Sequence, residues 1–251
     1  MKSRLLFVAM LLWLMNGIAV AAYRAEPLVV DDRQDAVALG LHTDYLLDET
    51  GTLRLEEVMT RTDFRSGDEP ALSFGFTQDT IWVRFQLQNR SEIPQTRILD
   101  VRYFLLDNVT LYAPATDGQT VALPSGRVHP QGFRPDLSRF FAFELQLPPA
   151  TTQTYYLQVT SADAIALPLF LSSPARQQAY QVTDTLYMTL YVGMILSTIF
   201  FAVFMLVSLR ERELVYYLGF LLFHHLIVLN LMEGIPAAVL DLDTPFLTQE
   251  L

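Results

Sequence analysis

Few residues in this chain have the types and spacing that enzyme chemistry requires. Cysteine is absent and only four histidines occur, so no disulfide, thiolate metal site or thiol nucleophile is available. Neither the nucleophile elbow G-x-S-x-G nor the zinc motif H-E-x-x-H is present. No glycine-rich loop could cradle a phosphate. We therefore predict that the chain is not an enzyme and that it holds no cofactor and no metal ion.

The charged residues exclude a further class of partner. Asp31, Asp32 and Asp35 lie close together, but they lack the spacing and the glycine of a calcium loop, so we expect a solvated acidic segment. The net charge is −10 and Lys2 is the single lysine of the chain. A nucleic-acid-binding protein needs a clustered basic face. We predict no nucleic-acid partner.

Three polar side chains interrupt an apolar run near the end of the chain. His224 and His225 are adjacent, hence about 100° apart on a helix, and two such ligands cannot hold a metal without a third. Asn230 lies in the same run. Polar groups in hydrocarbon are costly and normally face the interior of a helix bundle. We expect all three to pack toward further helices.

Two residues of one expected strand could contact a ligand. Residues 80–88 alternate, with the apolar residues on one side and Trp82 and Arg84 on the other. Sugars are held by stacking on an aromatic ring and by planar polar groups, so we predict ligand-binding roles for Trp82, Arg84 and Arg139. The alternative is plain sheet packing, in which the arginine stem covers apolar surface.

The rest of the middle of the chain has the periodicity of short strands. Apolar residues also alternate in several other runs, with Pro-, Gly- and Asn-containing turns between them. Short strands at near-regular spacing predict a mainly β fold, an antiparallel β-sandwich over residues 22–172. These further runs are residues 98–106, 109–113, 139–147, 154–160 and 165–171, and residues 53–59 could form a short helix.

The amino terminus has the features of an export signal. Lys2 and Arg4 precede the ten apolar residues 5–14, and small residues lead up to Ala21. Ten residues are too few to span a bilayer, which takes about 20. We predict a signal peptide over residues 1–21 that is cleaved after Ala21. An uncleaved anchor helix is the alternative.

Two long uncharged runs follow the β-rich region. Residues 185–209 form a run of 25 and residues 214–232 a run of 19, close to the length that crosses a membrane. We predict a hairpin of two transmembrane helices. A buried helical hairpin of a soluble protein is the alternative.

The orientation of this hairpin follows from its arginines. The connecting loop, residues 210–213, carries Arg210 and Arg212, whereas the tail, residues 233–251, has neither lysine nor arginine. Cytoplasmic loops are enriched in these residues, so the loop is expected in the cytoplasm and the tail outside. Residues 173–184 form the junction that leads into the first span.

Five segments together resemble a known family. They are similar to the type-2 extracellular domain of bacterial seven-transmembrane receptors with diverse intracellular signalling modules, and to the junction between the first two helices of those receptors. The likeness extends over residues 45–234. The segments are LSFGFTQDTIWVRFQLQN (72–89), RYFLLDNVTLYAP (102–114), SRFFAFELQLPP (138–149), TYYLQVTSADAIALPLFLSSP (154–174) and SLRERELVYYLGFLLF (208–223).

The resemblance implies a jelly-roll-like sandwich in the periplasm that binds carbohydrate or another small ligand. It also implies seven helices in the inner membrane and a cytoplasmic output module, such as a histidine kinase or a diguanylate cyclase. The chain stops after two helices, so we expect it to be the amino-terminal part of a longer receptor, or the product of a gene truncated from one.

The function that follows is ligand sensing, passed from the sandwich to the helices through residues 173–184. The partners would be the membrane, a small ligand, and a second copy or a partner signalling protein. A scaffold that holds other envelope proteins is the rival interpretation. A glycan-cleaving enzyme is a third, and it would need two carboxylates about 5–10 Å apart in a cleft.

Overall fold

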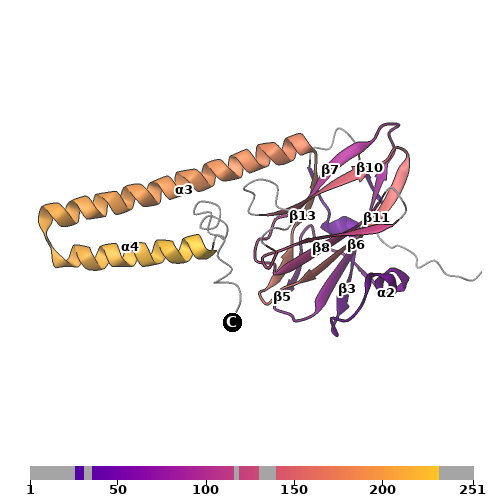
Figure 1. The fold of residues 1–251 in the computed structure, drawn as a ribbon, viewed down its shortest axis with the longest axis horizontal. Helices are drawn as coiled ribbons and strands as arrows, with labels where there is room; N and C mark the ends of the chain where they lie inside the picture. Colours follow the sequence, from indigo (N-terminus) through magenta and orange to yellow (C-terminus); the bar gives the residue numbers. More distant parts are fainter. Residues whose placement is uncertain (1–25, 31–35, 116–118, 130–139, 232–251) are drawn as a thin grey trace, which may run out of the picture.

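The computed structural model describes residues 26–30, 36–115, 119–129 and 140–231. They form a β domain followed by two long helices (Figure 1). The predicted fold class, a mainly β sandwich with antiparallel sheets followed by a helical hairpin, is confirmed. The predicted signal peptide and the tail 233–251 lie outside the described residues.

The larger layer of the sandwich is a seven-stranded sheet built around one long central strand. β6 carries the predicted alternation, and its apolar face is completely buried. β11 and β3 flank it in antiparallel register, while β1 pairs with its second half in parallel. In spatial order the strands are β4 (Arg65–Ser66), β3 (Thr43–Asp48), β6 (Thr80–Asn89), β11 (Thr151–Thr160), β8 (Asn108–Pro114) and β9 (Thr120–Ser125), with β1 (Leu28–Val30) beside β6.

The second layer is a four-stranded antiparallel sheet, and a two-stranded ribbon lies beside it. The sheet contains β10 (Phe141–Leu147), β7 (Gln95–Val101), β13 (Leu169–Ser172) and β2 (Ala36–Ala38), and the ribbon contains β12 (Ile165–Leu167) and β5 (Leu72–Gly75). A 3₁₀ turn, η1 (Gly40–His42), and a short helix, α2 (Leu55–Thr60), complete the domain.

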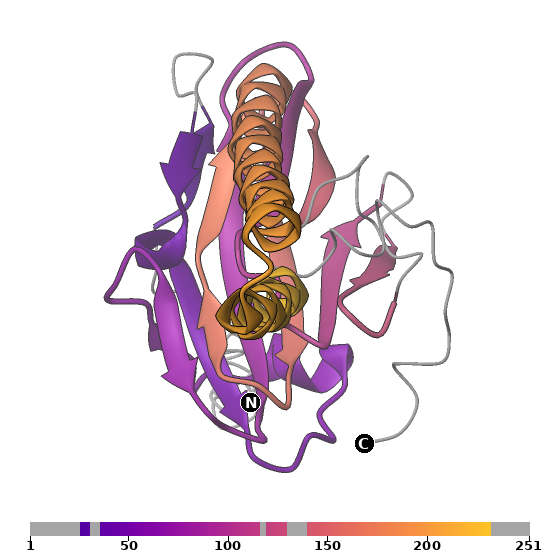
Figure 2. The same ribbon diagram turned by 90° about the vertical axis from the view of Figure 1, so that its left-hand side faces the viewer.

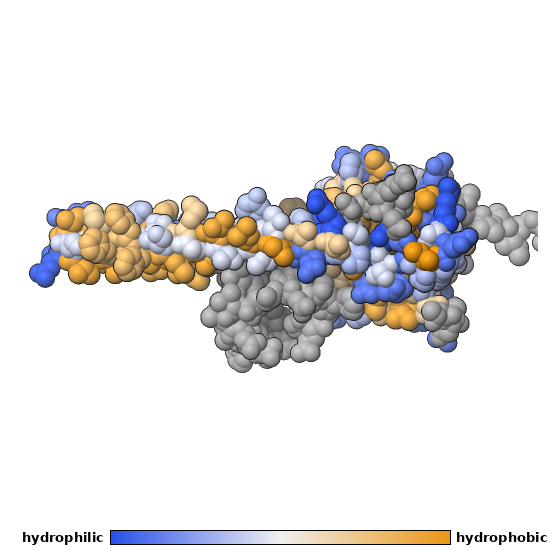
Figure 3. Space-filling view, turned by 90° about the horizontal axis from the view of Figure 1, so that it is seen from above, coloured by the Kyte–Doolittle hydropathy of each residue, from blue (hydrophilic) through white to orange (hydrophobic). Residues whose placement is uncertain are grey.

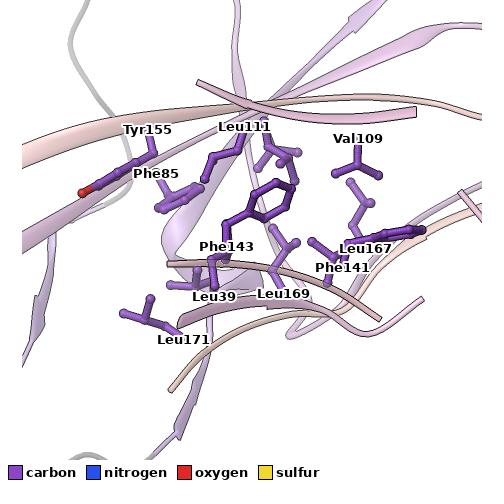
Figure 4. Packing of buried hydrophobic residues seen from close by; sticks show 14 of the residues in the cluster. Leu39, Phe85, Val109, Leu111, Phe141, Phe143, Tyr155, Leu167, Leu169 and Leu171 are labelled. Atoms are coloured by element: carbon purple, nitrogen blue, oxygen red, sulfur yellow. The ribbon is translucent and has the colours of Figure 1, made fainter. Parts of the chain in front are cut away.

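The core fills the space between the two layers. Phe85 of β6 stacks on Tyr155 of β11 with ring centroids 5.4 Å apart, and Phe143 and Leu169 approach from the opposite sheet (Figure 4). Burial raises the pKa of Tyr155, whose hydroxyl donates to Gln153 Oε1 at 2.7 Å. The apolar periodicity of the strands therefore builds one continuous core.

Two helices follow the last strand without a linker. α3 (Pro174–Leu209) begins where proline is favoured, and Ser173 caps it by accepting a hydrogen bond from the Arg176 amide at 3.2 Å. It ends at Arg210, whose φ of 57° is left-handed. α4 (Arg212–Leu231) then turns back and packs along α3 (Figure 1). The expected junction, residues 173–184, is thus the capping residue and first three turns of α3.

Candidate functional site

Trp82 lies on the outer face of the larger sheet, as its alternation predicted, but it is covered. Its side chain is 0% exposed and belongs to a second apolar cluster with Phe64 and with Val58 of α2. Its ring stacks on Tyr112 with centroids 5.6 Å apart. In this structure Trp82 therefore offers no ring to a ligand.

Arg84 lies beside Trp82 and is also buried. Its Nη2 donates to Asp44 Oδ2 at 2.9 Å, with 5% and 0% of the two side chains exposed. The ring of Phe64 lies 4.1 Å from the guanidinium carbon, within cation–π range. Burial raises the pKa of Tyr156, while Arg84 acts to lower it. Arg84 is thus a buried ion-pair partner in the covered half of the sheet.

These positions differ from the exposed stripe that the sequence predicted. Trp82 and Arg84 match the packing alternative, because α2 and the segment after it fold over this half of the sheet. The third predicted residue, Arg139, lies outside the described residues. Ligand binding by the three residues stays a prediction.

The same face is partly open next to this covered cluster, at whose edge Tyr112 packs. Tyr112 and Gln158 are half-buried, and the Tyr112 hydroxyl donates to Gln158 Oε1 at 3.0 Å. Gln86 and Thr154 are also half-buried, and the Gln86 amide donates to Thr154 Oγ1 at 3.0 Å. Burial raises the pKa of Tyr112, and nearby Glu56 raises it further. We call Tyr112, Gln158, Gln86 and Thr154 the open face; it combines an aromatic ring with planar amides and a hydroxyl.

A second polar cluster joins the smaller sheet to α3. Arg102 Nε donates to Asp100 Oδ2 at 2.7 Å. The guanidinium of Arg102 lies between two rings, 4.2 Å from the centroid of Phe170 and 3.8 Å from that of Tyr180 on α3. Phe170 comes from β13, so the arginine holds two strands and the helix together. We call Asp100, Arg102, Phe170 and Tyr180 the junction cluster.

The first turns of α3 are buried against this cluster. Gln177 is 4% exposed and accepts a hydrogen bond from Ser172 Oγ at 3.3 Å. Burial raises the pKa of Asp100; Arg102 and Gln177 oppose this shift, and Asp184 of α3 adds to it. The start of α3 packs against β7 of the smaller sheet, and from there the helix projects away from the domain, toward the viewer in Figure 2. The start of the helix is therefore fixed to the domain by packing, by the hydrogen bond between Ser172 and Gln177 and by the stacking of Tyr180 on Arg102.

Sequence reasoning located the junction but missed most of its contacts. Residues 98–106 were predicted as a strand, and Asp100 and Arg102 are the charges within that apolar run. Charges on a strand with two buried faces need partners, and that signal could have pointed to α3. The open face was implied by the alternation over residues 109–113 and 154–160.

The far part of α3 has the character of a membrane segment. Among the helices of the described residues, α3 is the one long and apolar enough to cross a membrane, judged by length and composition. Its apolar side chains are exposed, with Phe200 at 76% and Met194 at 69%. The space-filling view shows apolar surface along the helices and mainly polar surface on the domain (Figure 3).

Residues 40–173 match the family 7TMR-DISM extracellular 2. The chain belongs to this family. The match covers the sandwich from η1 to the residue before α3, which leaves out β1 and β2. With the apolar helix it makes the chain a membrane protein with an outward-facing domain. The 7TMR-DISM extracellular 2 domain thus ends where α3 begins. No curated protein matches the chain.

Solved structures resemble the domain only weakly. A Cry1Da tryptic core variant of Bacillus thuringiensis is 13% identical, with 41% of this chain and 20% of that chain covered and a TM-score of 0.26. The GH31 α-xylosidase of Xanthomonas citri is 13% identical, with 52% and 15% covered and a TM-score of 0.26. A family 35 carbohydrate-binding module from an environmental isolate is 15% identical, with 40% and 69% covered and a TM-score of 0.23. At such TM-scores these likenesses support no inference about function.

Proposed function

We propose that the chain is the periplasmic, ligand-sensing part of a signal-transduction receptor in a bacterial inner membrane, without catalytic activity of its own. The observation that carries this proposal is the junction cluster, in which Arg102 stacks on Tyr180 of α3. A domain that only needed a tether could end in a flexible linker. Here the last strand leads directly into a helix that is packed against the sheet.

In this mechanism, a ligand binds the sandwich and the change reaches α3 through the smaller sheet. We propose the open face as the binding surface and a carbohydrate as the ligand class. Tyr112 can stack on a sugar ring. Gln158 can exchange its hydrogen bond with Tyr112, and Gln86 its hydrogen bond with Thr154, for bonds to sugar hydroxyl groups. Both amides are accessible in part, whereas Trp82 is not.

The test is to screen the full chain, in detergent, against a panel of mono- and oligosaccharides. Tyr112→Ala should abolish binding of any sugar that the parent binds. Gln146→Ala is the matched control, because Gln146 is an exposed glutamine on the outer face of the opposite sheet, bonded to Thr96 at 3.0 Å, and it should bind as the parent does. Binding unaffected by Tyr112→Ala would move the ligand site elsewhere.

Sensing, as distinct from binding, requires a response in α3. The amide hydrogen exchange rates of residues 174–184 should change when a sugar that the parent binds is added to it. The same sugar should bind Arg102→Ala without that change. A chain that binds sugar with no response in these amides would be a scaffold or binding protein instead.

A further inference from the structure

The end of the sandwich toward which α3 runs is defined by successive contacts along β7. Gln177 lies beside Asp100, and Tyr180, one turn later, stacks on Arg102 beyond the end of β7. α3 therefore runs in the direction of β7 and leaves the domain where β7 ends. The chain segment after β7 lies at that end.

The loop before β6 lies at the same end. Val101 at the end of β7 pairs with Leu169 at the start of β13. The chain reaches β13 from the end of β11 through the short strand β12, so the end of β11 lies at this end of the domain. There Val159 of β11 pairs with Ile81 at the start of β6. Residues 75–79 lead into that start, and β5 before them lies on the side of the domain toward which the helices extend (Figure 1).

This loop presents an apolar tip. Phe76 is 84% exposed, more than Tyr216 on α4 at 79%. Gly75 before it has a φ of +66°, which a residue with a side chain rarely adopts, and this turn carries Phe76 away from Phe74, whose ring packs against Tyr45 at 5.1 Å. The exposure of Phe76 is therefore built into the turn.

The level of the membrane follows from α3. Asp184 is the last charge before the uncharged run, and it lies about 6 Å along the helix from Tyr180. The headgroup layer on each side of a bilayer is roughly 5–8 Å thick. The rim of the domain beside Tyr180 is thus within reach of the headgroups.

We propose that Phe76 inserts into the outer surface of the bilayer and forms a second contact between the domain and the membrane, besides α3. The contact is apolar, because Phe76 is 84% exposed, whereas Asp79 of the same loop is half-buried. At the same end of the domain Arg127 bonds to Asp107 at 2.7 Å and to Asp163 at 3.2 Å. Zwitterionic lipid is sufficient for it. The inference rests on the proposed membrane anchoring by α3.

The chain has no cysteine, so single cysteines can be spin-labelled in the full chain. We compare Phe76→Cys with Ile93→Cys in phosphatidylcholine vesicles. Ile93 is a matched control, 59% exposed in the turn between β6 and β7 at the opposite end of the domain. Collision rates with oxygen, relative to those with a water-soluble nickel complex, should be several-fold higher at position 76 than at position 93.

A third label, Ser197→Cys in the middle of the uncharged run of α3, separates the two proposals. A membrane-buried label at position 197 with a fully hydrated label at position 76 overturns the insertion of Phe76 and leaves the anchor intact. Hydrated labels at both positions overturn the anchor itself. A label at position 76 that inserts only after phosphatidylglycerol is added would mean electrostatic attraction, and would also overturn the apolar contact.

Discussion

At the residue scale, the pair Asp44–Arg84 illustrates how a charged residue is kept inside a sheet protein. Both side chains have lost their water, and a nearby ring and hydroxyl replace part of it: Phe64 stacks on the guanidinium and Ser66 donates to the carboxylate at 3.1 Å. A buried pair contributes little net stability as a unit, but removing one partner is costly. This half of the sheet must therefore stay covered if the two buried charges are to keep these partners.

We expect Arg84→Ala to lower the free energy of unfolding by about 3–5 kcal/mol, because Asp44 stays buried without its guanidinium partner. Denaturant unfolding followed by the fluorescence of Trp82 measures this. Arg61→Ala is the control, since its pair with Asp63 is as short, 2.7 Å, but 45% and 53% exposed. It should leave unfolding unchanged, and equal losses in both variants would contradict the buried-pair interpretation.

The raised pKa of Asp100 makes the stability of the fold depend on pH. Burial raises its pKa above the ordinary value of 3.8, against the opposing effects of Arg102 and Gln177. The folded state then binds the proton more tightly than the unfolded state does. The stability contributed by this group is complete below its unfolded pKa and is lost as pH rises through the folded pKa.

We therefore expect the stability of Asp100→Asn, relative to the parent, to increase as pH rises from about 4 to 7. Melting temperatures of the two chains across that range test this expectation. A difference that stays constant or decreases with pH would show that the carboxylate of Asp100 is stabilised rather than strained at the junction.

Trp82 and Arg84 also show which features of the sheet could be predicted from the sequence and which could not. Alternation assigned Trp82 and Arg84 to the correct face of β6, because a period of two is a local property. It could not predict their burial, because the cover comes from Val58 and Phe64, about 20 residues away in sequence. Long-range cover of this kind leaves no periodic signal on the strand itself.

At the element scale, the same limit separates long strands from short ones. The strands β6, β8, β10 and β11 were predicted near their observed bounds, because their residues alternate clearly. β1, β2, β4 and β5 have only two to four residues and were missed. β3 and β9 have six residues each and were missed as well, since β3 begins and ends with polar residues and β9 contains Pro124; β7 begins and ends earlier than predicted. α3 was predicted from its apolar run alone, so its polar first turns, which contact the domain rather than lipid, were taken for a junction.

Those first turns should open when their anchor is removed. We expect Tyr180→Ala to raise the amide exchange rates of residues 174–184 about tenfold, because it removes one ring from the cation–π stack on Arg102, worth about 1–2 kcal/mol in a partly desolvated site. Gln178→Ala is the matched control on the exposed side of the same helix. Equal exchange in the two variants would mean that Tyr180 does not hold α3.

At the scale of the whole molecule, tyrosines occur near both ends of the helical pair. Tyr187 and Tyr191 follow the charge of Asp184 on α3, and exposed Tyr216 and Tyr217 begin α4. Tyrosine is enriched at the two surfaces of a bilayer. About 39 Å of helix separate Asp184 from Arg210, enough for a hydrocarbon core of about 30 Å. α3 thus has the length of a membrane span, with tyrosines near each end of the helical pair; a second span formed by α4 stays a prediction.

This arrangement predicts the side of the membrane on which each end lies. With the predicted export signal and the two arginines around the turn, we expect the sandwich outside and Glu211 in the cytoplasm. In intact cells, a membrane-impermeant maleimide should label Glu92→Cys, at the exposed turn after β6, and should not label Glu211→Cys between the helices. Both cysteines should react once the cells are permeabilised. Labelling of Glu211→Cys but not Glu92→Cys in intact cells would reverse the orientation, and the sandwich could then sense only ligands of the cytoplasm.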